Sequence, residues 1–522
     1  MSWITVRCGL PTIQAYAQTF SETPSLIVCT QSPLCESRVV DWEDMAGSSI
    51  ESSRNGQAAA GPEMQQRPSP AVQAMVKDAL RHHQEGRLAD AERMYKEILR
   101  VDPEQADSLH LLGMIAYQRG CHENAVELTR KAIAIKGNAA SFHSNLGNVH
   151  QSQRKLIEAG ACYQRALVLK PGLAEVWVNL GNIYKAQGEV ESSLTCYRRA
   201  LAINPELAEA AAGESMALLL SGDFASGWIH FDRRWQTRDF NSPMRAYPIP
   251  LWNGKKLASG RLLIWGEQGI GDEIMFAGLI PDAIRTGSRC VLDCDARLSP
   301  LFARSFPGVD VVSGFDLGSH PELEIAAHLP GGSLPRLFRA TKDSFAATTS
   351  PYLVADLTGR ERFRAEYRDG RKLVGLAWHT RNKTTGIDRC VELSMLAPIF
   401  AQPGIRWFSL QYGDHDALEK EVAGTPMVVD RTVNQFTDVD RFAAQIAAMD
   451  LVITIDNSTA HLAGALGIPT WVLLPFAPDW RWMLDRDDSP WYPTMRLFRQ
   501  KTTGDWQAVM QTVKCAIGQY AR

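Results

Sequence analysis

Small and large apolar positions recur every 34 residues in the first half of this chain. Four glycines lie on this grid, with Arg154 at the missing point: Gly86, Gly120, Gly188 and Gly222. Prolines keep the same period, with Gly137 in the remaining slot: Pro103, Pro171 and Pro205. A fixed period of this length predicts a stack of similar helical units, in which proline ends a helix.

Within one period the pattern resembles the tetratricopeptide repeat, a helix–turn–helix unit. The clearest copy carries Trp177, Leu180, Gly181, Tyr184, Gly188, Tyr197, Ala200 and Pro205. We expect four repeats from about 72 to 205 and a degenerate fifth to about 235, in a repeat domain at 71–240. The concave face of such an array usually holds a protein segment, and a purely structural spacer is the alternative.

From about residue 245 the pattern changes to short apolar strands that alternate with helical stretches. The first series is predicted at 261–265, 290–292 and 309–312. The second series is predicted at 373–378, 406–410, 427–429, 451–455 and 471–474, with a final helix at 506–520. Two such series predict two Rossmann-like lobes with parallel sheets, at 245–360 and 370–522. A ligand would bind between them, at the carboxyl ends of the strands.

Composition narrows the class of protein. The 522 residues are enough for two to four domains, and residues 1–70 have the composition of a disordered lead-in. The net charge of −3 argues against a nucleic-acid binder, and no apolar stretch is long enough to predict a membrane span. Ten scattered cysteines without a CxxC pair favour a reduced, cytoplasmic protein.

The most informative segment runs from Asp456 to Pro469. It follows a β-branched apolar strand, and its first residues (Asn457, Ser458 and Thr459) can cap a helix. The start of a helix has unpaired N–H groups and the positive end of the helix dipole, so it can bind a diphosphate. His461 stands in the first turns, where it either faces the phosphate or packs against the protein.

The first lobe opens with a glycine-rich loop, Gly266–Asp272. Gly269 and Gly271 would let the backbone approach a ligand closely. Asp272 would begin the next helix and face the cleft, either as a catalytic carboxylate or as an ordinary helix-start residue.

Polar and cationic residues follow the first two strands of the second lobe. Thr380, Lys383 and Arg389 come after the strand at 373–378, and such side chains suit a phosphate-bearing substrate. Gln411 holds the equivalent place after the next strand and could bind a base or ribose. Each of these could also be an ordinary loop residue.

Together these segments resemble a GT-B glycosyltransferase of the heptosyltransferase-like family (glycosyltransferase family 9-like). They are similar, more closely, to bacterial fusions of tetratricopeptide repeats with such a transferase, some of which glycosylate flagellin. The fold class expected is therefore an α-solenoid followed by an α/β GT-B fold. The resemblance covers roughly residues 72–520. Heptosyltransferases usually carry Thr-Gly where Asn457-Ser458 stands here.

The resemblance implies roles for the candidate residues. Asp272 would be the base that deprotonates the acceptor hydroxyl. The helix start after Asp456 (Asn457, Ser458, Thr459 and His461) would bind the donor diphosphate, and Lys383 or Arg389 would neutralise the leaving nucleotide. Transfer would invert the anomeric carbon without a metal or cofactor, the nucleotide-sugar being a substrate.

Two further features need an interpretation. Asp293-Cys294-Asp295 and Asp438-Val439-Asp440 match the DxD metal motif of another glycosyltransferase fold, but we do not expect a metal at either. The aromatic stretch from Trp480 to Tyr492 either stacks on a sugar or base or forms core.

The sequence thus predicts a cytoplasmic glycosyltransferase whose repeats bring a protein acceptor, possibly flagellin, to the cleft. One alternative is transfer to a lipid or polysaccharide acceptor. Another is an inactive scaffold that binds proteins through its repeats. If the repeats only recruit the acceptor, deletion of residues 72–235 should leave donor binding intact.

Overall fold

The computed structural model describes residues 70–348, 350–381 and 386–521, so the predicted lead-in lies almost wholly outside the described residues. The chain forms two compact units, residues 1–137 and 138–522. The described part of the first unit consists of two helix pairs packed around Ala91, Tyr95 and Ile115. They are α2 (Pro70–Gln84), α3 (Leu88–Val101), α4 (Ala106–Gln118) and α5 (His122–Ile135).

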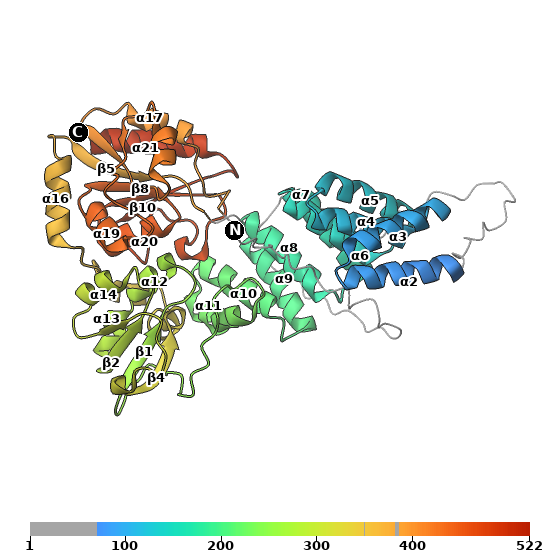
Figure 1. Ribbon diagram of the computed structural model, residues 1–522, viewed down its shortest axis with the longest axis horizontal. Coiled ribbons are helices and arrows are strands. Elements are labelled where there is room, and N and C mark those ends of the chain that lie inside the picture. Colours follow the sequence, from blue (N-terminus) through green and yellow to red (C-terminus); the bar gives the residue numbers. More distant parts are fainter. Residues whose placement is uncertain (1–69, 349, 382–385, 522) are drawn as a thin grey trace, which may run out of the picture. The chain divides into compact units, whose positions relative to one another are not determined.

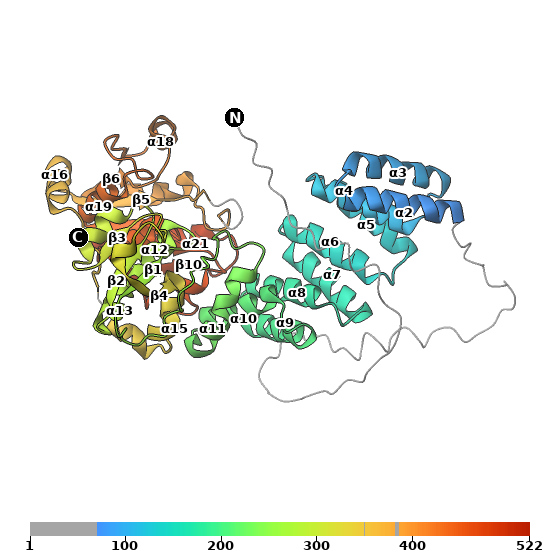
Figure 2. The same cartoon turned by 60° about the horizontal axis from the view of Figure 1, so that its bottom comes forward.

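The second unit begins with five further repeat helices, which follow one another in Figure 2. They are α6 (Ala140–Ser152), α7 (Leu156–Leu169), α8 (Ala174–Ala186), α9 (Val190–Ile203) and α10 (Ala208–Ser221). A Cβ at Gly181 would lie 2.8 Å from the fully buried ring of Tyr197, so only glycine lets this tyrosine fill the groove. Gly147 and Tyr163 repeat the contact one period earlier. The spacing of small and large residues therefore produces the predicted helix pairs.

The degenerate fifth unit continues through α11 (Phe224–His230) and the 3-10 helix η2 (Phe231–Gln236). Its residues lie in the same core as the sheets: Trp228 is buried, its indole N–H donates to the carbonyl of Arg339 at 2.8 Å, and its ring packs edge-on against Trp480. The end of the repeat array is therefore part of the α/β core.

Two parallel sheets follow (Figure 1). The first has the order β3-β2-β1-β4, from β1 (Arg261–Trp265), β2 (Arg289–Asp293), β3 (Asp310–Val312) and β4 (Ile325–Pro330). Its helices are α12 (Ile270–Ala277), α13 (Ile280–Arg285), α14 (Ser299–Ser305) and α15 (Leu334–Phe338). Two short helices, α12 and α13, follow the glycine-rich loop in place of one long helix, because the chain turns at Gly278.

The second sheet has the order β10-β9-β8-β5-β6-β7. Its strands are β5 (Lys372–Ala377), β6 (Ile405–Ser409), β7 (Met427–Val428), β8 (Leu451–Ile455), β9 (Thr470–Leu474) and β10 (Met495–Arg499). Its helices are α16 (Leu357–Tyr367), α17 (Ala397–Phe400), α18 (His415–Val422), α19 (Val439–Ala447), α20 (Ser458–Ala465) and α21 (Trp506–Tyr520). Short 3-10 turns lie between them, among them η5 (Asp343–Ala347) and η7 (Trp480–Trp482).

Successive side chains of β8 face opposite sides of the sheet, which explains why helices cover both of its faces. Val452 faces the core that holds α19 and α20, while Leu451, Ile453 and Ile455 face the core under α21. Figure 1 shows α19 and α20 on one face and α17 and α21 on the other. A strand covered on both faces must be apolar throughout, which is why this strand was easy to predict.

All eight predicted strands are present within one residue at each end, and the final helix is present at 506–520. Two strands were missed. β4 contains His328 and ends in Pro330, and β10 alternates charged with apolar residues. Neither has the continuous apolar run that predicts a strand buried on both faces.

Candidate functional site

The two sheets meet where α12 and α20 begin. A Cβ at Gly271 would lie 3.3 Å from Cδ2 of His461 and 3.5 Å from Cα of Ser458. The glycine-rich loop after β1 thus packs directly against the helix start after β8. Asp272 and Ser458, far apart in the sequence, therefore share one small region.

Asp272 is the third residue of α12, and Oδ2 accepts the N–H of Gly269 at 3.3 Å. Its other oxygen accepts a hydrogen bond from Nη2 of Arg481 in η7, which follows β9. Arg481 also donates from Nη1 to Asp479 at 2.6 Å. Burial acts to lower the pKa of Arg481, but Asp479 and Asp272 outweigh it and hold the pKa above its ordinary value. Sequence reasoning missed Arg481, which lay inside the aromatic stretch.

The start of α20 is a capped helix N-terminus next to the glycine-rich loop. Asn457 caps the helix, and Oδ1 accepts from the N–H of Ala460 at 3.2 Å and from Oγ1 of Thr454 at 3.0 Å. Ser458 is half-buried beside it. Two buried polar atoms have no partner in the described part of the chain, Nδ2 of Asn457 and Oγ1 of Thr459. Both atoms can donate a hydrogen bond to a water or to a polar ligand at this helix start.

Asp456, which is buried, and Arg389, which is half-buried, form an ion pair next to this helix start. Nη1 of Arg389 lies 3.0 Å from Oδ2 of Asp456. Burial raises the pKa of Asp456, and the charge of Arg389 opposes the rise. Of the two predicted phosphate cations, Arg389 is thus placed beside α20, while Lys383 lies outside the described residues.

His461 is buried one turn into α20. Nδ1 lies 2.9 Å from the hydroxyl of Tyr492, and the imidazole stacks on Trp482 at a centroid distance of 5.5 Å. Burial lowers the pKa of His461 to about 4, so the ring is neutral at pH 7. Of the two expectations for this residue, the packing role describes its contacts.

The residues after β5 and β6 are joined to each other. Oε1 of Gln411 accepts the N–H groups of Trp378 and His379, both at 3.0 Å, and Nε2 donates to the carbonyl of Tyr412. Gln411 is fully buried, so its amide holds these two strand ends together instead of facing a base or ribose. The hydroxyl of Tyr412 lies 3.3 Å from Oγ1 of Thr380.

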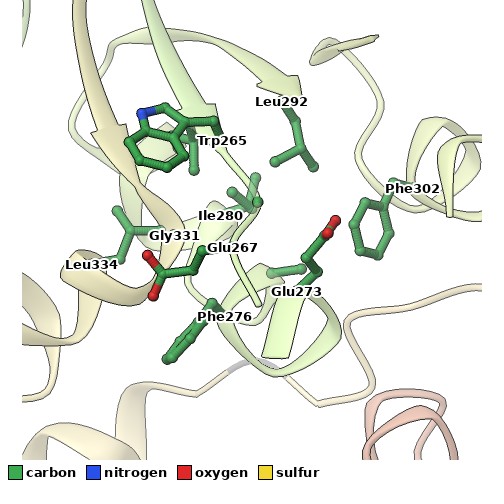
Figure 3. Close-up of a pocket in the computed structure, with 12 residues that line it drawn as sticks. Trp265, Glu267, Glu273, Phe276, Ile280, Leu292, Phe302, Gly331 and Leu334 are labelled. Carbon is green, nitrogen blue, oxygen red and sulfur yellow. The ribbon is translucent and has the colours of Figure 1, made fainter. Parts of the chain in front are cut away.

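Two glutamates, one within the glycine-rich loop and one directly after it, were not predicted as site residues. Glu267 pairs with Arg234 of η2 through both carboxylate oxygens, at 3.0 and 2.8 Å. Oε2 of Glu273 accepts the N–H of Asp295 at 2.9 Å, and burial raises the pKa of Glu273 to about 7. Their carboxylates point away from each other around a cavity of about 20 Å³, which has room for little more than a water molecule (Figure 3).

The aromatic stretch forms core. Trp480, Trp482, Trp491 and Tyr492 are all buried, so they offer no open face for stacking on a sugar.

The two DxD segments have protein partners. Asp293 accepts from Arg245 and from the N–H of Phe315, and Asp295 pairs with Arg297. Asp438 caps α19, and Asp440 pairs with Arg304. Across residues 70–348, 350–381 and 386–521, no group of three or more acidic, histidine or cysteine side chains could hold a metal ion. Likewise, none of the helices described is both long and apolar enough to cross a membrane.

Comparison with known proteins confirms the repeats. Residues 78–140 and 174–207 match tetratricopeptide repeat families. The chain is 32% identical over 328 residues to Protein FlbA of Caulobacter vibrioides, a match that covers 58% of this chain and about half (54%) of that protein. Repeats of this type bind proteins, so protein binding is the function that these matches support.

Solved structures similar to part of the chain include MamA (23% identity, TM-score 0.28, covering 30% of this chain and 91% of that one). Another is pilF of Pseudomonas aeruginosa (22% identity, TM-score 0.30, covering 31% and 74%).

Proposed function

We propose that this chain is a glycosyltransferase of the GT-B type that moves a sugar from a nucleotide-sugar to a protein held by the repeats. The observation that carries the proposal is the approach of Asp272, after the first strand of one sheet, to the start of α20 in the other. A carboxylate and an anion-binding helix start at the carboxyl ends of two parallel sheets are the groups that sugar transfer from a phosphate requires.

The donor phosphate would bind at the start of α20. The first-turn N–H groups have no acceptor within the helix, and the helix dipole favours negative charge there by about 0.3–1 kcal/mol, up to ~2 when partly buried. Arg389 lies close to this helix start, because it pairs with Asp456, two residues before α20. As the bond between the anomeric carbon and the phosphate oxygen breaks, the electron pair stays on the phosphate, whose growing charge these groups stabilise.

Asp272 would accept the proton of the acceptor hydroxyl while the oxygen of that hydroxyl bonds to the anomeric carbon on the opposite face. The reaction therefore inverts the configuration of the anomeric carbon. A positioned general base contributes roughly 10²–10⁴-fold to the rate. Arg481 fixes the carboxylate so that one oxygen is held and the group cannot rotate freely.

The protein acceptor is the partner that the repeats favour. Tetratricopeptide arrays bind protein segments in a continuous groove, and in this chain the last repeats share a core with both sheets. An acceptor segment bound along α8 to α10 would therefore lie at a fixed position relative to Asp272.

Intact-mass spectrometry of abundant proteins tests the proposal in cells that carry the wild-type chain or Asp272→Asn. Asp78→Asn is the matched control, because Asp78 is an exposed residue of α2. We expect one or more proteins to lose whole monosaccharide masses in Asp272→Asn cells alone. If glycolipids or polysaccharides lose sugar instead, the acceptor is not a protein. Unchanged masses and unchanged glycans would contradict the transferase assignment.

A further inference from the structure

Successive turns of the repeat array contact the loops at the carboxyl edge of the second sheet. A Cβ at Gly188, in the turn after α8, would lie 3.2 Å from the ring of Phe476, just after β9. One period later, a Cβ at Gly222 would lie 2.5 Å from Cε of Met483, which follows η7. One period earlier, the turn after α6 contacts the loop after β5 through Arg154. Three consecutive turns of the array therefore lie along this edge of the sheet.

The loops that the turns contact carry charged groups of the candidate site. Asp388, the residue that the turn after α6 contacts, directly precedes Arg389, the cation beside the start of α20. The segment 476–483 contains Arg481, which holds Asp272. The repeat array thus supports both loops from outside the sheet.

Arg154 departs from the repeat pattern at this contact. The other four turns have glycine at the same position, and the turn at residue 154 keeps the left-handed backbone, with φ of 62°. A residue with a Cβ is disfavoured in this region, whereas glycine is not. The arginine therefore costs stability in the turn, and what it adds is a hydrogen-bonded ion pair, from Nη2 to Oδ2 of Asp388.

We propose that Arg154 is a positioning residue of the donor site: its ion pair with Asp388 holds the loop after β5 so that Arg389 stays beside the start of α20. This inference rests on the proposed function. It follows that the repeats do more than recruit a protein, since one of their turns supports the binding of the nucleotide-sugar.

Isothermal titration calorimetry of the full chain with UDP, GDP, ADP and CMP tests this inference. For the nucleotide that the wild type binds most tightly, Arg154→Gly should weaken binding about two- to fivefold, because the side chains of the pair are 45% and 51% exposed. Arg154→Lys keeps the charge and should recover part of the loss. Arg119→Gly is the matched control, because Arg119 is equally exposed, ends another inner helix and pairs with Glu92. It should bind like the wild type.

Two further measurements separate the ion pair from a general effect on the fold. The double variant Arg154→Gly/Asp388→Asn should lose no more affinity than the larger of the two single losses, because either change breaks the same pair. Raising NaCl from about 0.02 M to about 1 M should remove the difference between the wild type and Arg154→Gly, since salt screens an exposed pair.

Thermal melting shows whether the variant folds. Glycine suits the left-handed turn, so the melting temperature of Arg154→Gly should be equal or higher, and weaker binding with an intact fold supports the inference. Wild-type affinity in Arg154→Gly, additive losses in the double variant, or a loss that accompanies a lower melting temperature would overturn it and leave the proposed function standing. If the wild-type chain binds none of the four nucleotides, the proposed donor site fails and the inference with it.

Discussion

Nη2 of Arg481 donates to Oδ1 of Asp272, so a loop of the second sheet holds the carboxylate that begins the first helix of the first sheet. The same guanidinium donates to Asp479 and lies over the buried ring of Trp480, 4.6 Å from its centroid. The ion pair fixes the orientation of Asp272 and, at the same time, joins the two sheets.

Asp272→Asn should lower turnover by roughly 10²–10⁴-fold and leave nucleotide affinity nearly unchanged, because the amide keeps the shape of the side chain but cannot take a proton. Steady-state kinetics and calorimetry on the same preparation measure both quantities.

The neighbouring carboxylate provides the control. Glu273 lines the small cavity and accepts a hydrogen bond from the backbone of Asp295, so Glu273→Gln should keep most of the activity. If Glu273→Gln loses the activity and Asp272→Asn keeps it, the base has been assigned to the wrong residue.

Arg481→Met should reduce turnover by about 10²-fold, because Asp272 would no longer be held in place and a displacement of ~1 Å is enough for such a loss. Arg481→Lys keeps the charge but lacks the planar guanidinium that bonds Asp272 and Asp479 together, so its turnover should lie between those of Arg481→Met and the wild type. Turnover and nucleotide affinity should be measured in each variant. A strong fall in turnover with little change in nucleotide affinity would identify a positioning role. Full turnover in Arg481→Met would rule that role out.

The buried pair between Arg234 and Glu267 should stabilise the fold around the glycine-rich loop. Arg234→Met leaves Glu267 buried without a counterion and should lower the free energy of unfolding by ~3–5 kcal/mol. The double variant Arg234→Met/Glu267→Leu should lose less. Arg233→Met removes an adjacent, largely exposed pair with Glu206 and should change stability by less than ~1 kcal/mol. Urea unfolding measures all three, and equal losses in the single and double variants would contradict the argument.

Much of the architecture could be predicted because its signals are local. Strands such as Leu451–Ile455 are continuous apolar runs, and the 34-residue spacing fixes the helix pairs. The helix start at Asn457 was equally local, because its capping side chain bonds to the backbone three residues on.

The residues that sequence reasoning missed depend on distant partners. Arg481 and Asp272, for example, are 209 residues apart. A lone arginine between tryptophans has the pattern of an ordinary surface residue. Gln411 illustrates the opposite case: its strand-end position suggested a ligand contact, but its amide is used by the backbone of Trp378 and His379.

Deletion of the repeats should depend on where the chain is cut. Removal of residues 1–137 takes away one compact unit and should leave a folded chain that still binds nucleotide. Removal of residues 1–235 also takes away Trp228 and Arg234, exposing Trp480 and leaving Glu267 unpaired. We therefore expect this second truncation to aggregate, which revises the expectation that residues 72–235 can be removed without harm to donor binding. Circular dichroism and size-exclusion chromatography compare the two, and a folded 236–522 fragment would contradict the structure-based boundary.

The pH dependence of stability should report on His461. Burial lowers its pKa to about 4 in the folded chain, whereas the unfolded chain has a value of ~6.5. Between these values the unfolded state binds the extra proton, so the stabilisation present above pH ~6.5 is lost as the pH falls towards 4. The shift corresponds to about 3 kcal/mol.

His461→Gln cannot take up that proton and should lose correspondingly less stability than the wild type over this range. Urea unfolding of both proteins at pH 7, 6, 5 and 4.5 measures the difference, which cancels the titration of groups that the two share. Parallel profiles would mean that His461 is protonated at its ordinary pKa in the folded chain, and that its contacts with Tyr492 and Trp482 do not keep the ring neutral.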